Sequence, residues 1–144
     1  MDAFVLDCSA TLPWVFADEA SPADEASPAA DALLDQLVKG ERAWVPALWH
    51  LELGNVLLGA QRRNRIDQAG IEAFLSRLAL YEITVDDQTM ERAWQKTLDL
   101  AMQHGLSTYD ASYLELALRR GLPLATLDRQ LVAAARASGV RVLP

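Results

Sequence analysis

Four acidic residues have positions that suggest chemistry rather than a solvated surface: Asp7, Glu52, Asp110 and Asp128. Asp7 follows the apolar run AFVL and Asp128 ends LPLATLD, so each comes at the end of an apparent short strand. Carboxylates gathered in one place repel each other, which raises the pKa of some of them. A divalent cation such as Mg²⁺ or Mn²⁺ relieves that repulsion because it prefers oxygen ligands. Such a metal can activate water and stabilise charge on a phosphate, so the set suits phosphodiester hydrolysis.

The segment LSTYDASYLELALRR predicts a helix that buries an acid. Residues three and four apart share a helix face, so Asp110 is expected to point inward with Tyr113, Leu114, Ala117 and Leu118. A buried lone carboxylate is costly unless it is paired. We expect a bound metal ion to be its partner.

Glu52 lies in PALWHLELGNVLLGAQRRNR, a segment apolar nearly all round that predicts a buried helix. At 100° per residue, Asn55, Val56 and Gly59 share the face of Glu52. A glutamate on this helix is therefore hard to explain as a solvated side chain.

Each of the other three acids has a structural alternative. Asp7 and Asp128 each stand where the N-cap of the following helix is expected. Ser107 and Asp110 match a capping box, in which the acid reaches back to the helix N-terminus. The metal interpretation rests on the whole set, because ligands of open α/β sheets bind beyond the carboxyl ends of the strands.

The elements that must position these acids alternate between strands and helices. Strands are expected at Phe4–Leu6, Ala43–Val45, Glu82–Val85, Pro123–Thr126 and Val140–Leu143. Helices are expected at 29–38, 47–64, 67–79, 87–104, 108–120 and 129–138, with Gly40, Gly105, Gly121 and Gly139 as C-caps. The pattern predicts a single α/β domain over residues 1–144, with a parallel sheet covered by helices on both faces.

The composition indicates a compact cytoplasmic protein. The chain has 144 residues, 51% of them hydrophobic, and its apolar runs are far shorter than a membrane span. The N-terminus does not resemble a signal peptide. A single cysteine, Cys8, excludes an internal disulfide, and Cys/His spacings typical of zinc sites are absent.

The net charge of −7 is concentrated at the N-terminal end. Residues 1–38 hold eight acids and no lysine or arginine, so the remainder carries 12 acids (20 − 8) and all 13 bases, a net charge of about +1. Part of this acidity is a tandem repeat, ADEASP at 17–22 and again at 23–28. The simplest interpretation of the repeat is a solvated acidic loop. The acidity weakens the case for a nucleic-acid substrate without excluding it.

The segments VLDCSATLPWVF, LELGNVL and LSTYDASYLELALRRGLPLATLDRQLVAAARASGVRVL together resemble the PIN-domain family, above all its VapC-type toxins. The resemblance covers essentially the whole chain. It implies a three-layer α/β/α domain whose central parallel sheet has about five strands. It also implies a ribonuclease that uses Mg²⁺ or Mn²⁺. Carried over by position, the metal-binding acids are Asp7, Glu52, Asp110 and Asp128, and the small polar residues that orient groups or hold water are Ser9, Asn55 and Thr126.

The resemblance further implies partners. A VapC-type toxin cuts cellular RNA, forms a homodimer and binds a cognate VapB-like antitoxin whose C-terminal arm lies near the site. The duplicated loop at 17–28 departs from a typical member, in a region where such antitoxins often dock. It puts the geometry of antitoxin binding in question more than the catalysis.

RNA binding needs cationic contacts to phosphate. The clearest candidates are Arg62 and Arg63, which come 10 and 11 residues after Glu52 on the same predicted helix. Arg63 is expected roughly 16 Å from Glu52 along the axis and about 20° away around it. The alternative is a solvated helix C-terminus, where the helix dipole favours cationic side chains.

Three other functions compete with this interpretation. A haloacid-dehalogenase-like phosphatase also begins with a strand that ends in aspartate, but it generally needs a second aspartate where this chain has Ser9. A non-catalytic binding module would be favoured by missing acids, and all four are present. A nuclease acting on DNA stays open, because the sequence does not identify a residue that reads the 2′-hydroxyl.

Overall fold

The computed structural model describes residues 3–16 and 28–143. A five-stranded sheet runs through the domain, and all of its strand pairs are parallel. Its order is β3-β2-β1-β4-β5, with β1 (Ala3–Leu6), β2 (Arg42–Val45), β3 (Ile83–Val85), β4 (Leu124–Ala125) and β5 (Val142–Leu143). The five predicted strands and the parallel sheet are confirmed. The duplicated segment 17–28 lies outside the described residues except for Pro28.

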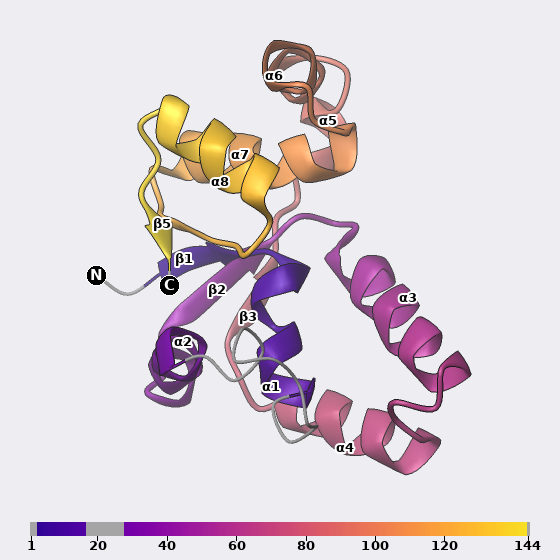
Figure 1. Cartoon of the computed structure of the whole chain (residues 1–144). Helices are drawn as coiled ribbons and strands as arrows, with labels where there is room; N and C mark the ends of the chain where they lie inside the picture. The colour runs from indigo at the N-terminus through magenta and orange to yellow at the C-terminus, as the bar shows by residue number, and fades with distance from the viewer. Residues whose placement is uncertain (1–2, 17–27, 144) are drawn as a thin grey trace.

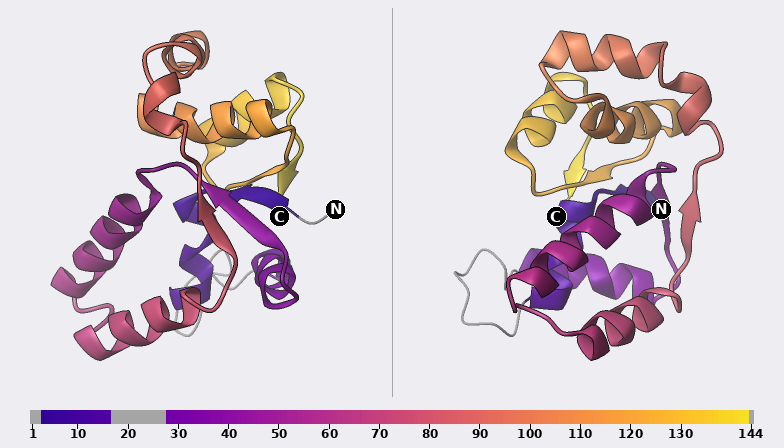
Figure 2. Two further views of the ribbon diagram at one scale, coloured as in Figure 1. Left: turned by 180° about the vertical axis from the view of Figure 1, so that it is seen from behind. Right: turned by 90° about the vertical axis from the view of Figure 1, so that its right-hand side faces the viewer.

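Helices cover both faces of the sheet (Figures 1 and 2). One layer holds α1 (Leu12–Phe16), α2 (Pro28–Val38), α3 (Trp49–Arg62) and α4 (Gln68–Leu78); the other holds α5 (Thr89–Arg92), α6 (Lys96–His104), α7 (Thr108–Arg120) and α8 (Arg129–Ala137). The change of layer after β3 has a simple cause. Crossovers between parallel strands are right-handed, so connections that run in opposite directions across the sheet lie on opposite faces.

Two features of the helical layers differ from the sequence prediction. The predicted helix 87–104 is two helices, α5 and α6, separated by a turn at 93–95 that lets α6 pack along α7. The short helix η1 (Cys8–Ala10) and α1 follow β1, where a helix start after Asp7 was only an alternative and no helix bounds were predicted. Both are too short to show a helical period in sequence, and no proline or glycine marks the turn at 93–95.

The core lies around β1 and α7. Phe4, Val5 and Leu6 on β1 are fully buried, as expected for a central strand between two neighbours. On α7, Tyr113, Leu114 and Ala117 are buried as predicted, but Asp110 and Leu118 are only half-buried. All residues from 111 to 117 are buried, so the helix is not buried along a single stripe. Gly105 and Gly121 end α6 and α7 in the left-handed conformation that the predicted C-caps require.

The prediction that α3 is buried nearly all round is wrong. Its buried side chains form one stripe, Trp49, Leu53, Leu57 and Ala60, whereas Leu51 is 75% exposed. The helix therefore has an exposed side, as a surface helix does. Among the described helices, none is long and apolar enough to cross a membrane.

Candidate metal centre

The topology brings Asp7 beside the end of β4. The strand order reverses between β1 and β4, and an open parallel sheet binds its ligands at such a switch point. Leu6 pairs with Ala125, and the backbone N–H of Asp7 donates to the carbonyl of Ala125 at 3.0 Å. Asp7 and Thr126 are consequently neighbours although they are far apart in sequence.

Two hydroxyl groups hold the Asp7 carboxylate. Ser9 Oγ and Thr126 Oγ1 each donate to Asp7 Oδ2 at 2.7 Å. The two hydroxyls are fixed in turn, because they accept the backbone N–H groups of Leu127 (2.9 Å) and Asp128 (3.1 Å). Asp7 precedes η1, but its side chain makes no cap hydrogen bond there. Asp7 thus occupies the N-cap position that was the structural alternative, but capping does not account for its carboxylate.

The other three acids come from helix starts. Glu52 lies in the first turn of α3 and accepts a hydrogen bond from the hydroxyl of Tyr113. Asp110 lies in the first turn of α7, which Ser107 caps by accepting the N–H of Asp110 at 3.1 Å. Asp128 is the N-cap of α8 and accepts the N–H of Leu131 at 3.1 Å, so the capping alternative is realised for Asp128.

Electrostatic interactions connect the four acids. Burial raises the pKa of Asp7, and the charges of Asp110 and Asp128 raise it further, against the hydrogen bonds from Ser9 and Thr126. Burial is also the largest cause of the raised pKa of Glu52, to which the charges of Asp7 and Asp110 add. These charge–charge interactions show that four acids share one electrostatic environment. They are here called the site acids: Asp7, Glu52, Asp110 and Asp128.

Burial and the charge of Asp128 likewise raise the pKa of Asp110, opposed by the Ser107 hydroxyl. Within residues 3–16 and 28–143, no lysine, arginine or histidine forms an ion pair with any of the site acids. The repulsion among them is therefore not balanced by a cationic side chain.

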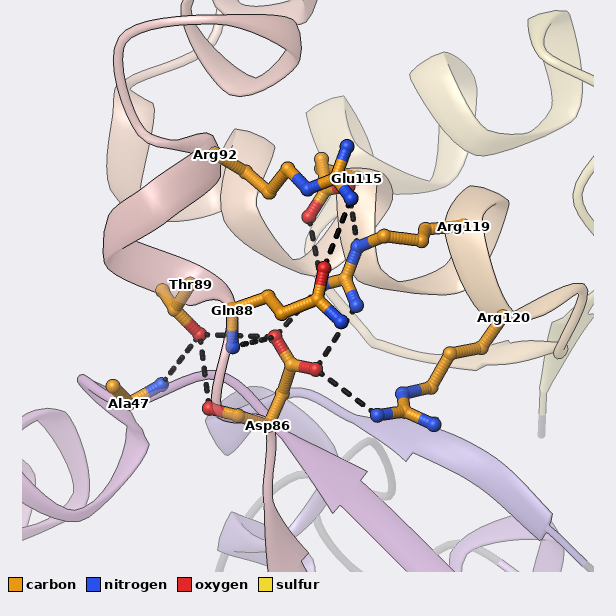
Figure 3. Close-up of polar contacts among 8 residues, drawn as sticks. All are labelled: Ala47, Asp86, Gln88, Thr89, Arg92, Glu115, Arg119 and Arg120. Carbon is orange, nitrogen blue, oxygen red and sulfur yellow. Dashed lines mark hydrogen bonds and ion pairs between the residues drawn. The ribbon is translucent and has the colours of Figure 1, made fainter.

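Asp86, which follows β3, is a buried acid that is paired with arginines (Figure 3). It is 1% exposed, and Arg119 donates to its two oxygens at 3.0 and 2.7 Å. Arg120 donates to it at 3.2 Å. Burial alone would raise the pKa of Asp86, but the hydrogen bonds and charge of Arg119, with the hydrogen bond from Arg120, outweigh burial and lower that pKa.

The chemistry of the site acids fits a hard divalent cation. All the groups are carboxylate oxygens, and in both Asp7 and Glu52 one oxygen takes the hydroxyl hydrogen bonds while the other accepts none from the described residues. As they stand, the described side chains contain no group of three or more His, Cys, Asp or Glu residues arranged to hold a metal. Binding would require the carboxylates to move closer together.

None of the remaining predicted residues makes a hydrogen bond or ion pair with a site acid within the described part of the chain. Asn55 is exposed on α3 and makes no hydrogen bond within the described part of the chain. Arg62 and Arg63 are exposed at the opposite end of α3 from Glu52. The contact of Tyr113 with Glu52 was not predicted, because two residues 61 positions apart leave no local pattern in the sequence.

Comparison with known proteins gives a consistent result. The chain matches the family model of the PIN domain over residues 5–137. It is 34% identical to Exonuclease VapC9 of Pyrobaculum aerophilum over 90 residues, which are 60% of this chain and 65% of that protein. The chain thus spans slightly less than two thirds of the length of this relative.

Solved structures share the fold at lower identity. The crystal structure of PAE2754 from Pyrobaculum aerophilum superposes with a TM-score of 0.68 and 24% identity, over 98% of this chain and 89% of that one. VapC20 of Mycobacterium tuberculosis is described as a sarcin-ricin loop cleaving toxin. It superposes with a TM-score of 0.61 and 21% identity, over 98% of this chain and 99% of that one. These likenesses confirm the α/β/α fold.

Proposed function

Because the chain belongs to the PIN domain family, we propose that it is a Mg²⁺- or Mn²⁺-dependent endoribonuclease and the toxin of a toxin–antitoxin pair. The observation that carries this proposal is a difference between the buried Asp86 and the site acids, of which Asp7 is buried and the other three are half-buried. Asp86 accepts hydrogen bonds from two arginines. The site acids repel one another, and among the described residues no cationic side chain is paired with them. A bound divalent cation supplies the missing charge.

In this proposal Asp7, Glu52, Asp110 and Asp128 hold the cation. When bound, the cation supplies an activated water and stabilises the charge that develops on the phosphate. Ser9 and Thr126 keep the carboxylate of Asp7 in one orientation through their hydrogen bonds. The α8 N-terminus does the same for Asp128, and Asn55 on the exposed side of α3 is available to a water or the substrate.

The names of similar proteins support a nucleic-acid substrate and leave the mode of cleavage to be tested. One relative is named an exonuclease and one structural neighbour a loop-cleaving toxin. A circular RNA distinguishes the two modes, because only an endonuclease can cut a chain without ends. Linear RNA, single-stranded DNA and a small phosphomonoester test the competing substrates in parallel.

The deciding experiment uses purified, antitoxin-free protein on these substrates with Mg²⁺, Mn²⁺ or EDTA, beside the variants Asp7→Asn and Asp110→Asn. We expect circular RNA to be opened with either metal, and neither EDTA-treated protein nor either variant to cleave. Cleavage that survives EDTA contradicts the metal mechanism. Turnover of the phosphomonoester without RNA cleavage favours the phosphatase, and cleavage of DNA alone favours a DNA nuclease.

We also propose the partners that the resemblance implies, a homodimer and a cognate antitoxin, in a cytoplasmic setting. The mass of the purified protein by light scattering tests the homodimer, and a monomer at micromolar concentration contradicts it. Growth arrest on expression, relieved by co-expression of the antitoxin and absent for Asp7→Asn, tests the toxin role. Arrest by the inactive variant contradicts it.

A further inference from the structure

We propose that Tyr113 is a positioning residue that orients the Glu52 carboxylate for cation binding. This inference rests on the proposed metal-dependent function and assigns a role to a residue outside the site acids. It follows from where the hydroxyl of Tyr113 lies, from the environment that surrounds it and from the second oxygen that it leaves available on Glu52.

The hydroxyl of Tyr113 lies where three chain segments meet. Tyr113 belongs to α7 and donates to Glu52 Oε1 in the first turn of α3. Its other polar neighbour is Cys8 Sγ at 3.9 Å, in the segment that follows Asp7. Tyr113 also comes one helical turn after Asp110, so α7 presents an acid and the holder of a second acid on one face.

The hydrogen bond from Tyr113 fixes the direction of the Glu52 carboxylate. Within residues 3–16 and 28–143, no other side chain donates a hydrogen bond to Glu52. Glu52 has several rotatable bonds, so without this donor its carboxylate can adopt several directions. The hydroxyl selects one of them and leaves Oε2 without a donor, which is the oxygen a cation can use.

The chemistry of the donor matters as much as its position. A tyrosine hydroxyl is neutral at physiological pH, because its ordinary pKa is about 10, and Tyr113 is fully buried. It therefore orients Glu52 without cancelling the charge, unlike the arginines at Asp86. Ser9 and Thr126 act on Asp7 in the same way. Carboxylates that bind metals are commonly held by such hydrogen bonds.

Core packing alone does not account for the hydroxyl. The buried ring could be a phenylalanine, and a buried hydroxyl costs free energy unless it has a partner. The cysteine is a weak partner, and its thiol also contacts the carbonyl of Trp49 at 3.6 Å. Glu52 is thus the strong acceptor that keeps the hydroxyl of Tyr113 in place.

The test is Tyr113→Phe, which removes one oxygen atom, compared with Tyr109→Phe. Tyr109 is a matched control because it lies on the same helix and is 65% exposed. Mn²⁺ is titrated into each protein by calorimetry, with no substrate present, and the melting temperature is recorded in EDTA. We expect Tyr113→Phe to weaken Mn²⁺ binding about 10-fold or more, and Tyr109→Phe to leave it unchanged.

The same titration with Glu52→Gln and the Tyr113→Phe/Glu52→Gln double variant shows whether Tyr113 acts through Glu52. If it does, adding Tyr113→Phe to Glu52→Gln weakens Mn²⁺ binding no further. A folded Tyr113→Phe protein with wild-type affinity overturns the proposal. So does an equal further loss in the double variant, which indicates a general structural effect.

A measurement on the wild-type protein makes the test independent of any variant. With tyrosine ring carbons labelled, Mg²⁺ is added and the NMR signals of Tyr113 and Tyr109 are followed. We expect only the Tyr113 signal to move, because its acceptor takes up the cation. A Tyr113 signal that stays fixed while Mg²⁺ binds overturns the inference. Wild-type protein that binds neither Mg²⁺ nor Mn²⁺ instead overturns the proposed function itself.

Discussion

Asp7 and Asp86 are the same residue type, both almost fully buried, yet their carboxylates have opposite pKa shifts. The difference lies in their neighbours. Asp86 contacts two guanidinium groups, whereas Asp7 contacts two hydroxyls and shares its environment with other acids. A residue type and its burial therefore do not distinguish these two acids. The charge of the groups around each carboxylate does.

The raised pKa of Asp7 makes it a source of instability in the metal-free protein. A carboxyl group with a raised folded-state pKa binds its proton more tightly in the folded than in the unfolded chain. Its contribution to stability is greatest at low pH and falls as pH rises from the ordinary value of 3.8 through the folded-state pKa. At neutral pH, an uncharged replacement should be more stable.

Asp7→Asn is therefore expected to raise the free energy of unfolding in EDTA at pH 7, so that the variant melts at a higher temperature than the wild type. The asparagine keeps an oxygen that can accept from Ser9 and Thr126. Thermal unfolding from pH 4 to pH 8 checks the sign, since the advantage of the variant should grow with pH. The exposed Asp35→Asn serves as control. A variant less stable than the wild type at pH 8 contradicts the argument.

At the scale of elements, Asp86 joins α7 to the loop after β3 (Figure 3). Arg119 connects Asp86 to Glu115, one turn earlier on α7, at 2.8 Å. Arg120 also lies over the ring of Trp44 on β2, 3.6 Å from its centre. The network fixes one end of the helix whose other end carries Asp110.

Asp86→Ala is expected to destabilise the protein by about 1–3 kcal/mol, because it removes the buried acceptor that two half-buried arginines share, although Arg119 keeps its ion pair with Glu115. Since the pKa of Asp86 is lowered, its contribution is present above the ordinary value of 3.8 and is lost as pH falls through the folded-state pKa. The difference between variant and wild type should therefore shrink below pH 4. Urea denaturation at pH 7 and pH 3 measures it. The exposed neighbour Asp87→Ala should change stability by less than about 0.5 kcal/mol.

The far end of α3 is the place to test RNA binding. Arg63→Glu reverses a charge on an exposed side chain beyond the last turn of the helix. We expect weaker RNA cleavage, a shallower dependence on salt and an unchanged affinity for Mn²⁺. The control is Arg136→Glu, the same charge change at an exposed side chain of α8, which lies in the other helical layer (Figure 1). Equal losses in both variants would indicate a general charge effect and not a contact by Arg63.

The elements show what a single sequence can and cannot predict here. The helix α7 was predicted with its bounds because its apolar stripe and Gly121 are local signals. The contacts that define the site are not local: Tyr113 lies 61 residues from Glu52, and Arg119 lies 33 residues from Asp86. Sequence patterns therefore predicted the fold and offered the four acids as candidates, but not the groups that distinguish Asp7 from Asp86.

For the whole molecule, the proposed cation couples folding to metal binding. A ligand that binds only the folded state stabilises it, by about 2.7 kcal/mol at a concentration 100 times its dissociation constant. For a domain of 144 residues this corresponds to a rise of about 8 °C in melting temperature. The site acids repel one another without the ion, so the rise should be largest where they are ionised, at neutral and higher pH.

We therefore expect Mg²⁺ or Mn²⁺ to raise the melting temperature of the wild-type protein strongly, and that of Asp7→Asn and Glu52→Gln only slightly. Thermal scans are run with each metal salt and with NaCl at the same ionic strength, because salt alone also screens the repulsion. The Asp86→Ala protein is an informative comparison, since it is less stable but keeps all the site acids and should gain from metal as the wild type does. If NaCl stabilises the wild type as much as Mg²⁺, or if Asp7→Asn responds to Mg²⁺ in full, the acids are not the ligands of a bound ion.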